Sequence, residues 1–168
     1  MEKWDLYDEN RKPLNKIHHR GEELRLGENH IVVDIWTINS NREILLTLRD
    51  PDKQTHPNYW ENTAGSVLAG ESSSAGAARE LLEETGIKVR EDELVYLGTK
   101  KEVTAFVDSY ITKKDVRLSD LILQKGETVA AKWVSEEELN RMILKEEIAP
   151  PVIERLALVR DQFDKIRG

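Results

Sequence analysis

Cysteine is absent from this chain, and so is any long apolar run. Without cysteine there is no disulfide framework, no thiolate nucleophile and no cysteine-based zinc site. No apolar run approaches the roughly 18 residues of a membrane-spanning helix, and the first ten residues, MEKWDLYDEN, lack the features of a signal peptide. From these absences we expect a soluble cytoplasmic protein that has no membrane partner.

The chain also lacks an excess of positive charge, because acidic residues outnumber basic ones by 32 to 25. The 168 residues carry a net charge of −7, which argues against a nucleic-acid polymer as partner, because that affinity depends on cationic contacts. A small phosphorylated substrate remains compatible with this charge, since bound metal ions can supply positive charge locally. The length is that of one ordinary domain, and we therefore expect a single domain over residues 1–168.

The strongest chemical signal is the stretch 65–87, GSVLAGESSSAGAARELLEETGI. Residues 74–85 are predicted to form a helix, because the serine run at 72–74 supplies N-cap candidates. Gly86 lies where a left-handed C-terminal cap requires a residue without a Cβ atom. The sequence therefore predicts one short helix with defined ends.

Helical spacing places three carboxylates of this helix on one side, and we expect them to face outward together: Glu80, Glu83 and Glu84. The opposite side, predicted to face the core, holds Ala78, Leu81 and Leu82. Such carboxylates repel one another. A solvated acidic face is the common interpretation, but lysine is absent from 65–87. A hard divalent cation would relieve the repulsion, and Mg²⁺ is the cation that we favour.

The stretch 65–87 resembles the Nudix box, G-x5-E-x7-R-E-U-x-E-E-x-G-U, where U is an aliphatic residue. Every fixed position is met, namely by Gly65, Glu71, Arg79, Glu80, Leu81, Glu83, Glu84, Gly86 and Ile87. The resemblance implies an α/β fold, the Nudix α/β/α sandwich with a mixed β-sheet. It also implies hydrolysis of a diphosphate linkage, typically in a nucleoside diphosphate joined to another group. Mg²⁺ is the implied cofactor, with Mn²⁺ as the alternative.

The resemblance also implies roles for individual residues. The metal would be held by the three helix carboxylates, with the backbone carbonyl of Ala64 as a further ligand. Arg79 would orient Glu83 through an i,i+4 contact. Glu71 would pair with Arg79 or brace the loop, whereas Gly65 and Gly86 would serve the structure of the box.

A further carboxylate is needed as a metal ligand or as a base for the attacking water. Family members commonly draw it from the loop before a strand that ends in tryptophan, and here that strand is 128–134, TVAAKWV. Glu127 lies at its beginning and is our choice for this catalytic and metal-binding role. Glu102 and Asp108 are the rival candidates.

The rest of the chain alternates strands with helices. Residues 1–28 are predicted to contain an N-terminal β-hairpin, as an edge element or a homodimer contact. The other predicted strands are 30–38, 44–48, 94–98, 103–111 and 128–134, with a bulge in 103–111, where alternation fails. The helices that follow are predicted at 136–144, opened by a capping box, and at 152–166.

Two polar segments offer further contacts. The loop 49–60 lies between a core strand and the box, so Arg49, Lys53 and His56 either bind the substrate phosphates or are ordinary loop charges. The pair His18-His19, beside Arg20, either contacts substrate or metal or forms a polar turn, and we favour the turn.

Two alternative functions are compatible with parts of the sequence. NHIVVDIWTIN and THPNYWENTAG resemble type 1 isopentenyl diphosphate isomerases, a branch of the same superfamily. That chemistry needs a cysteine before the box glycine and a histidine after it, where this chain has Ala64 and Ser66, so isomerisation by that route is excluded. The other alternative is a non-catalytic nucleotide-binding module with a Nudix fold. Retention of every box carboxylate favours the enzyme.

Overall fold

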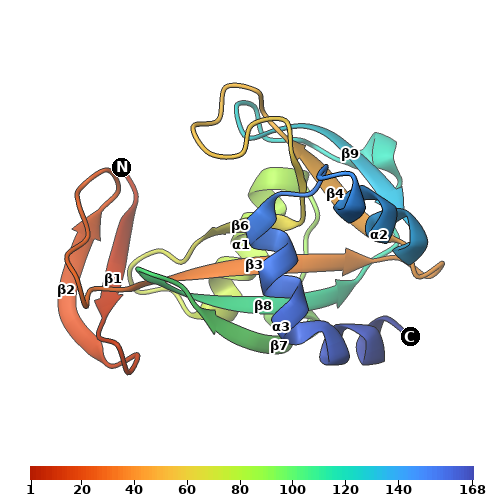
Figure 1. Ribbon diagram of the computed structural model, residues 1–168. Helices are drawn as coiled ribbons and strands as arrows, with labels where there is room; N and C mark the ends of the chain where they lie inside the picture. Colours follow the sequence, from red (N-terminus) through yellow and green to blue (C-terminus); the bar gives the residue numbers. More distant parts are fainter.

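A mixed seven-stranded β-sheet divides the molecule in this computed structural model, which describes residues 1–168 (Figure 1). Its strands are β3 (His30–Ile38), β4 (Ile44–Arg49), β5 (Trp60–Glu61), β6 (Thr63–Ser66), β7 (Val95–Lys101), β8 (Ala105–Lys113) and β9 (Thr128–Val134). The order is β5-β4-β3-β8-β7, with β6 also paired to β3 and β9 to β4. Only β3 and β8 run parallel to each other.

Strand β8 lies between β3 and β7 in the sheet and is buried along almost its whole length. Both of its faces are covered, which explains why its sequence does not alternate between polar and apolar residues. The register shift in this region falls in the partner strand β7, between Tyr96 and Gly98, rather than in β8 as predicted. The predicted start at Val103 is also wrong, because this residue is 87% exposed and precedes the strand.

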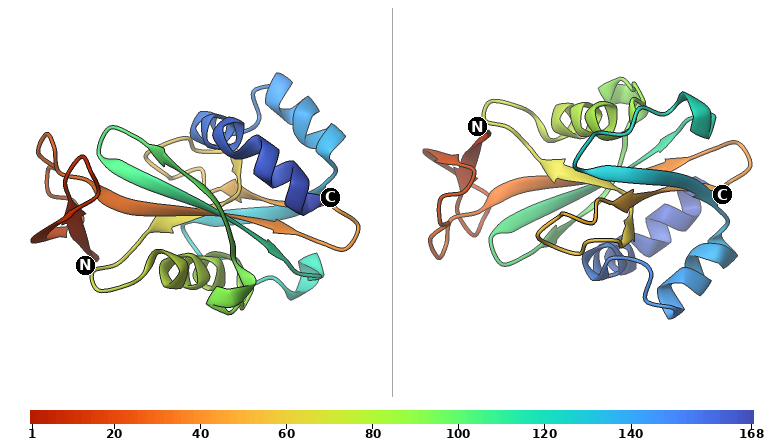
Figure 2. Two further views of the ribbon diagram at one scale, coloured as in Figure 1. Left: turned by 90° about the horizontal axis from the view of Figure 1, so that it is seen from below. Right: turned by 90° about the horizontal axis from the view of Figure 1, so that it is seen from above.

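Three α-helices cover the two faces of the sheet. Helix α1 (Ser73–Thr85) lies on one face, and α2 (Glu136–Leu144) and α3 (Pro150–Arg167) lie on the other (Figure 2). This arrangement confirms the predicted α/β/α sandwich. The hydroxyl of Ser135 accepts a hydrogen bond from the Glu138 N–H at the start of α2, and two prolines open α3. None of the helices has the length and apolar character needed to cross a membrane.

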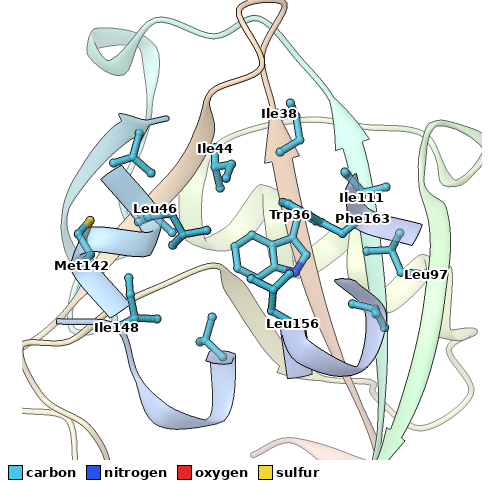
Figure 3. Packing of buried hydrophobic residues seen from close by; sticks show 14 of the residues in the cluster. Trp36, Ile38, Ile44, Leu46, Leu97, Ile111, Met142, Ile148, Leu156 and Phe163 are labelled. Atoms are coloured by element: carbon cyan, nitrogen blue, oxygen red, sulfur yellow. The ribbon is translucent and has the colours of Figure 1, made fainter. Parts of the chain in front are cut away.

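The sheet separates two apolar clusters. The larger one, 15 buried residues, lies between the sheet and α2 and α3, where Trp36 packs edge-on against Phe163 with 5.2 Å between ring centres (Figure 3). The smaller cluster, on the α1 side, includes Ala77 and Leu81 from that helix. Because α1 is anchored by these side chains, its position relative to β3 and β6 is fixed.

The predicted N-terminal hairpin is present and consists of β1 (Lys3–Tyr7) and β2 (Pro13–His19). It forms a two-stranded sheet of its own and is not an edge of the main sheet. It lies beyond one end of the main sheet (Figure 1). Trp4 stacks on His30 of β3, with 4.2 Å between ring centres, and on His18 of β2, with 5.3 Å. The predicted polar turn at His18 is therefore wrong, since this residue is 4% exposed and packs on the tryptophan.

Candidate active site

Local sequence signals define both ends of α1. The Ser72 hydroxyl accepts a hydrogen bond from the Ala75 N–H, and Gly86 adopts a left-handed φ of 77° while its N–H donates to the Leu82 carbonyl. Both predicted caps are thus confirmed. They set the register in which the helix presents its carboxylates.

Two of the three helix carboxylates are buried. Glu80 and Glu84 are 8% and 7% exposed, whereas Leu82, expected in the core, is 46% exposed. The expectation that all three carboxylates face outward is therefore wrong. The reason is that α1 packs this side against β6, where Gly65 leaves room. A Cβ atom on Gly65 would lie 2.1 Å from the carboxyl carbon of Glu80.

Arg79 lies at the centre of an ion-pair network. Its Nε donates to Glu71 Oε1 at 2.8 Å and its Nη2 to Glu71 Oε2 at 3.0 Å and to the Ser66 carbonyl at 2.8 Å. Its Nη1 donates to Glu80 Oε1 at 2.8 Å and to Glu83 Oε2 at 3.2 Å. Burial lowers the pKa of Arg79, but the hydrogen bonds to Glu71 and Glu80 outweigh burial and raise it. Arg79 therefore holds the glycine-rich loop and two helix carboxylates together.

An acidic cavity of about 190 Å³ opens beside this network. Five carboxylates line it, namely Glu2, Glu80, Glu83, Glu84 and Glu127. The lining also includes Ala64 and two basic residues, Arg20 and Lys53. The Lys53 ammonium contacts the Glu127 carboxylate, which joins the loop 50–59 to the turn before β9. The cavity thus combines a surplus of negative oxygen ligands with two cations at its wall.

Glu84 shows that this donor set fits a hard cation. Its Oε2 is buried and has no hydrogen-bond partner. Burial raises the pKa of Glu84 well above its usual value, and the charges of Glu61, Glu80 and Glu127 raise it further. A buried, unpaired carboxylate is unfavourable unless a cation compensates it. In the present side-chain conformations, no group of three or more acidic or histidine residues is close enough to hold a metal ion. Arg79 instead forms hydrogen bonds to oxygens of Glu80 and Glu83.

Of the three basic residues predicted in the loop 49–60, only Lys53 lines the cavity. The guanidinium of Arg49 donates to both oxygens of Glu61 at 2.9 Å and to backbone carbonyls of its own loop, so it braces that loop. His56 adopts a left-handed φ of 49° and packs edge-on against Tyr59. Neither Arg49 nor His56 lines the acidic cavity, and the contacts of Arg49 are those of the alternative interpretation, an ordinary loop charge.

The rival bases lie elsewhere. Glu102 accepts hydrogen bonds from Arg155 at 2.8 and 3.0 Å and lines a different cavity. Asp108 accepts hydrogen bonds from Arg11 and Ser73 and does not line the acidic cavity. Among the three candidates for the further carboxylate, only Glu127 lies with the helix carboxylates.

Sequence reasoning missed five residues of the cavity wall: Glu2, Trp4, Arg20, Ser66 and Gln124. The first three belong to the N-terminal hairpin, far from the box in sequence. No local pattern marks them, because their position depends on how the hairpin docks on β3. The one notable feature in this region of the sequence is Arg20 beside the histidine pair. The sequence does not indicate which part of the fold Arg20 contacts.

Comparison with known proteins agrees with this geometry. A family model described as NUDIX domain matches residues 28–156. A Nudix hydrolase of Listeria monocytogenes is 40% identical over 156 residues, covering 89% of each chain. An isopentenyl-diphosphate Delta-isomerase of Pectobacterium atrosepticum is 33% identical over 84 residues, 49% of this chain and 46% of that protein. The crystal structure of DR0079 from Deinococcus radiodurans superposes with a TM-score of 0.76 at 24% identity, over 95% of this chain and 98% of that one.

This chain belongs to the Nudix hydrolase family. The resemblance seen in residues 65–87 is thereby confirmed, and the class of enzyme with it. The likeness to the isomerase is limited to about half of the chain, in which no cysteine is present.

Proposed function

We propose that this protein is a Mg²⁺-dependent hydrolase that cleaves a diphosphate linkage, in a nucleoside diphosphate derivative. The observation that carries the proposal is the cavity in which Glu80, Glu83, Glu84 and Glu127 meet, with one buried Glu84 oxygen lacking a partner. The surplus of carboxylates in the cavity repels a diphosphate, because like charges repel. A divalent cation shared between protein and substrate makes the two compatible.

The residues that would hold the cation are Glu80, Glu83 and Glu84, together with Glu127 and the carbonyl oxygen of Ala64. When bound, Mg²⁺, or Mn²⁺ in its place, neutralises the diphosphate and lowers the pKa of an attacking water. Arg79 fixes the orientation of Glu83 and Glu80 through its forked hydrogen bonds.

Glu127 would take the proton of the attacking water or complete the metal site. It is the one carboxylate of the cavity that comes from the turn before β9, and its side chain is 33% exposed. Lys53 would bind a phosphate oxygen, since it is a cation in the wall of the cavity. A phosphate that engages Lys53 would leave the Glu127 carboxylate available to water or metal.

The assignment of Glu127 is tested by three matched variants. Glu127→Gln should lower kcat by about 10²–10³, the usual cost of removing a main catalytic charge, and should change the pH profile. Glu102→Gln and Asp108→Asn remove a carboxylate elsewhere and should retain most of the activity per folded molecule. Full activity of Glu127→Gln, combined with loss in either control, would reject Glu127.

The size of the cavity limits what it can hold. At about 190 Å³ it is smaller than the roughly 300–1,000 Å³ typical of a whole ligand site. It would accommodate the diphosphate and its cation, with the rest of the substrate bound outside it. For this reason the substrate itself has to be found by experiment.

A panel of nucleotide sugars, dinucleotides, nucleoside triphosphates and non-nucleotide diphosphates, each incubated with protein and Mg²⁺, tests the function. Released phosphate species are quantified for the parent and for Glu83→Gln. We expect Mg²⁺-dependent release by the parent and a loss of about 10²–10³ in the variant. Equal release by both would reject the site. Tight binding of a panel member without any turnover would favour a non-catalytic nucleotide-binding module.

A further inference from the structure

The N-terminal hairpin supplies one of the two cations at the cavity wall. Arg20 follows the last residue of β2, and it lines the acidic cavity together with Glu2 and Trp4 of the same hairpin. These residues precede the segment 28–156 that matches the family domain. We propose that Arg20 binds a phosphate group of the substrate and that the hairpin forms one wall of the substrate site. This inference rests on the proposed hydrolysis of a diphosphate.

Arg20 is the least engaged of the three basic residues at the site. The guanidinium of Arg79 is engaged by two carboxylates of α1, by Glu71 and by a backbone carbonyl. Lys53 is largely buried against Glu127, with 20% of its side chain exposed. Arg20 is 58% exposed and has a single ion pair, from its Nη1 to Glu2 Oε2 at 3.2 Å.

A phosphate group can replace Glu2 as the partner of Arg20 at little cost in stability. Ion pairs between exposed side chains contribute little to stability, because water competes for both partners. The planar guanidinium binds phosphate with two parallel hydrogen bonds and is therefore well suited to the exchange. Glu2 lines the same cavity as the three carboxylates of α1. A phosphate that replaces Glu2 at Arg20 would thus lie beside the carboxylates of α1.

The hairpin is attached firmly enough to hold Arg20 in place. The backbones of Tyr7 and Asn29 exchange hydrogen bonds of 2.8 and 2.9 Å. The Ala69 N–H donates to the Lys3 carbonyl at 2.8 Å, which joins β1 to the glycine-rich loop of the box. The N–H of Arg20 donates to the Glu2 carbonyl at 3.0 Å. The backbone of Arg20 is therefore tied to β1, and β1 to the loop that leads into α1.

Binding of imidodiphosphate, a diphosphate that is not hydrolysed, tests the assignment directly. Isothermal titration calorimetry is performed on the full chain with and without Mg²⁺. Arg20→Ala should weaken binding by about tenfold, the order expected for losing a hydrogen bond to a charged group. Arg20→Lys should recover part of this loss. Glu2→Gln should bind as tightly as the parent or more tightly, since it removes the competing carboxylate.

Arg25→Ala is the matched control, because Arg25 is exposed, lies five positions along the chain and does not line the acidic cavity. It should change the dissociation constant by less than about twofold. With a substrate found in the panel, Arg20→Ala should raise KM with little change in kcat, the result of lost binding common to ground and transition states. Thermal unfolding of each variant shows whether the hairpin remains folded.

The outcomes separate this inference from the proposed function. If Arg20→Ala and Arg25→Ala bind imidodiphosphate equally, Arg20 does not bind phosphate, whether or not the protein hydrolyses a diphosphate. If binding depends on Arg20 but no member of the panel is cleaved, the proposed hydrolysis fails and the assignment of Arg20 stands.

Discussion

Arg11, in the turn of the N-terminal hairpin, donates to both carboxylate oxygens of the buried Asp108 of β8, at 2.7 and 2.5 Å. The same carboxylate accepts hydrogen bonds from the hydroxyls of Ser73, the first residue of α1, at 2.5 Å and of Thr99 of β7 at 2.6 Å. One carboxylate thus joins the hairpin, the central sheet and the start of the box helix.

Removing Arg11 should destabilise this junction. Burial raises the pKa of Asp108, but the hydrogen bonds from Arg11, Ser73 and Thr99 outweigh burial and hold it below the usual value. A lowered pKa in the folded state stabilises the protein above the unfolded-state pKa of about 4, and this stability is lost as pH falls. Arg11→Ala should therefore cost about 1–3 kcal/mol at pH 7 and less at pH 3. Urea unfolding at both pH values measures the difference, and an equal cost at both would contradict the role of the charge.

Glu84→Gln should raise stability while abolishing turnover. The raised pKa of Glu84, caused first by burial and then by neighbouring carboxylates, means that its stabilising contribution is present below pH of about 4.5 and is lost as pH rises. Without metal at pH 7.5, Glu84→Gln should therefore melt a few degrees higher than the parent, on the scale of about 2–4 °C per kcal/mol. Turnover should fall by about 10²–10³. Addition of Mg²⁺ should stabilise the parent more than the variant; equal shifts would exclude Glu84 as a ligand.

Gly65→Ala should displace Glu80, because the new Cβ would lie 2.1 Å from its carboxyl carbon. Overpacking of this kind usually costs about 1–3 kcal/mol. A double-mutant cycle with Glu80→Ala isolates the clash, since the cost of Gly65→Ala should nearly vanish once the carboxylate is gone. An unchanged cost in the Glu80→Ala background would show that Gly65 serves another purpose.

Arg79→Lys should recover only part of the function that Arg79→Ala loses. The alanine variant leaves Glu71 and Glu80 without their cation, and loss of one partner of a buried pair costs about 3–5 kcal/mol. Lysine restores the charge but cannot donate to the carboxylates and the Ser66 carbonyl with one planar group. Urea unfolding and Mg²⁺-dependent turnover of the three proteins measure the ranking. Equal turnover of Arg79→Lys and the parent would contradict the orienting role.

Asp34 should contribute more stability in weak acid than at neutral pH. This residue is 1% exposed, and burial raises its pKa to about 6. Its stabilising contribution is therefore present below pH of about 4 and is lost as pH rises to 6. The difference is on the order of 2–3 kcal/mol, as the shift in pKa requires. Asp34→Asn should flatten the dependence of the unfolding free energy on pH between 4 and 7. A variant with the same slope as the parent would place the titration elsewhere.

Elements whose signals are local could be predicted from the sequence. The box helix was predictable because Ser72 and Gly86 satisfy its terminal backbone groups through nearby atoms. Strands β3 and β9 were predicted with their observed bounds, since apolar runs between turn residues define a strand without reference to partners. The fixed spacing of the box residues also indicates the family without any information about the fold.

Which side chains contact one another depends on how the elements pack. Glu80 is buried and Leu82 exposed because of where α1 rests on β6, and helical periodicity alone cannot specify the packing partner. Lys53 reaches the cavity whereas Arg49, four positions earlier, is bound to Glu61. Arg20 joins the site because the hairpin docks on β3 through Trp4. Contacts between segments that are distant in the chain depend on the packing of the whole fold, so a local sequence pattern cannot predict them.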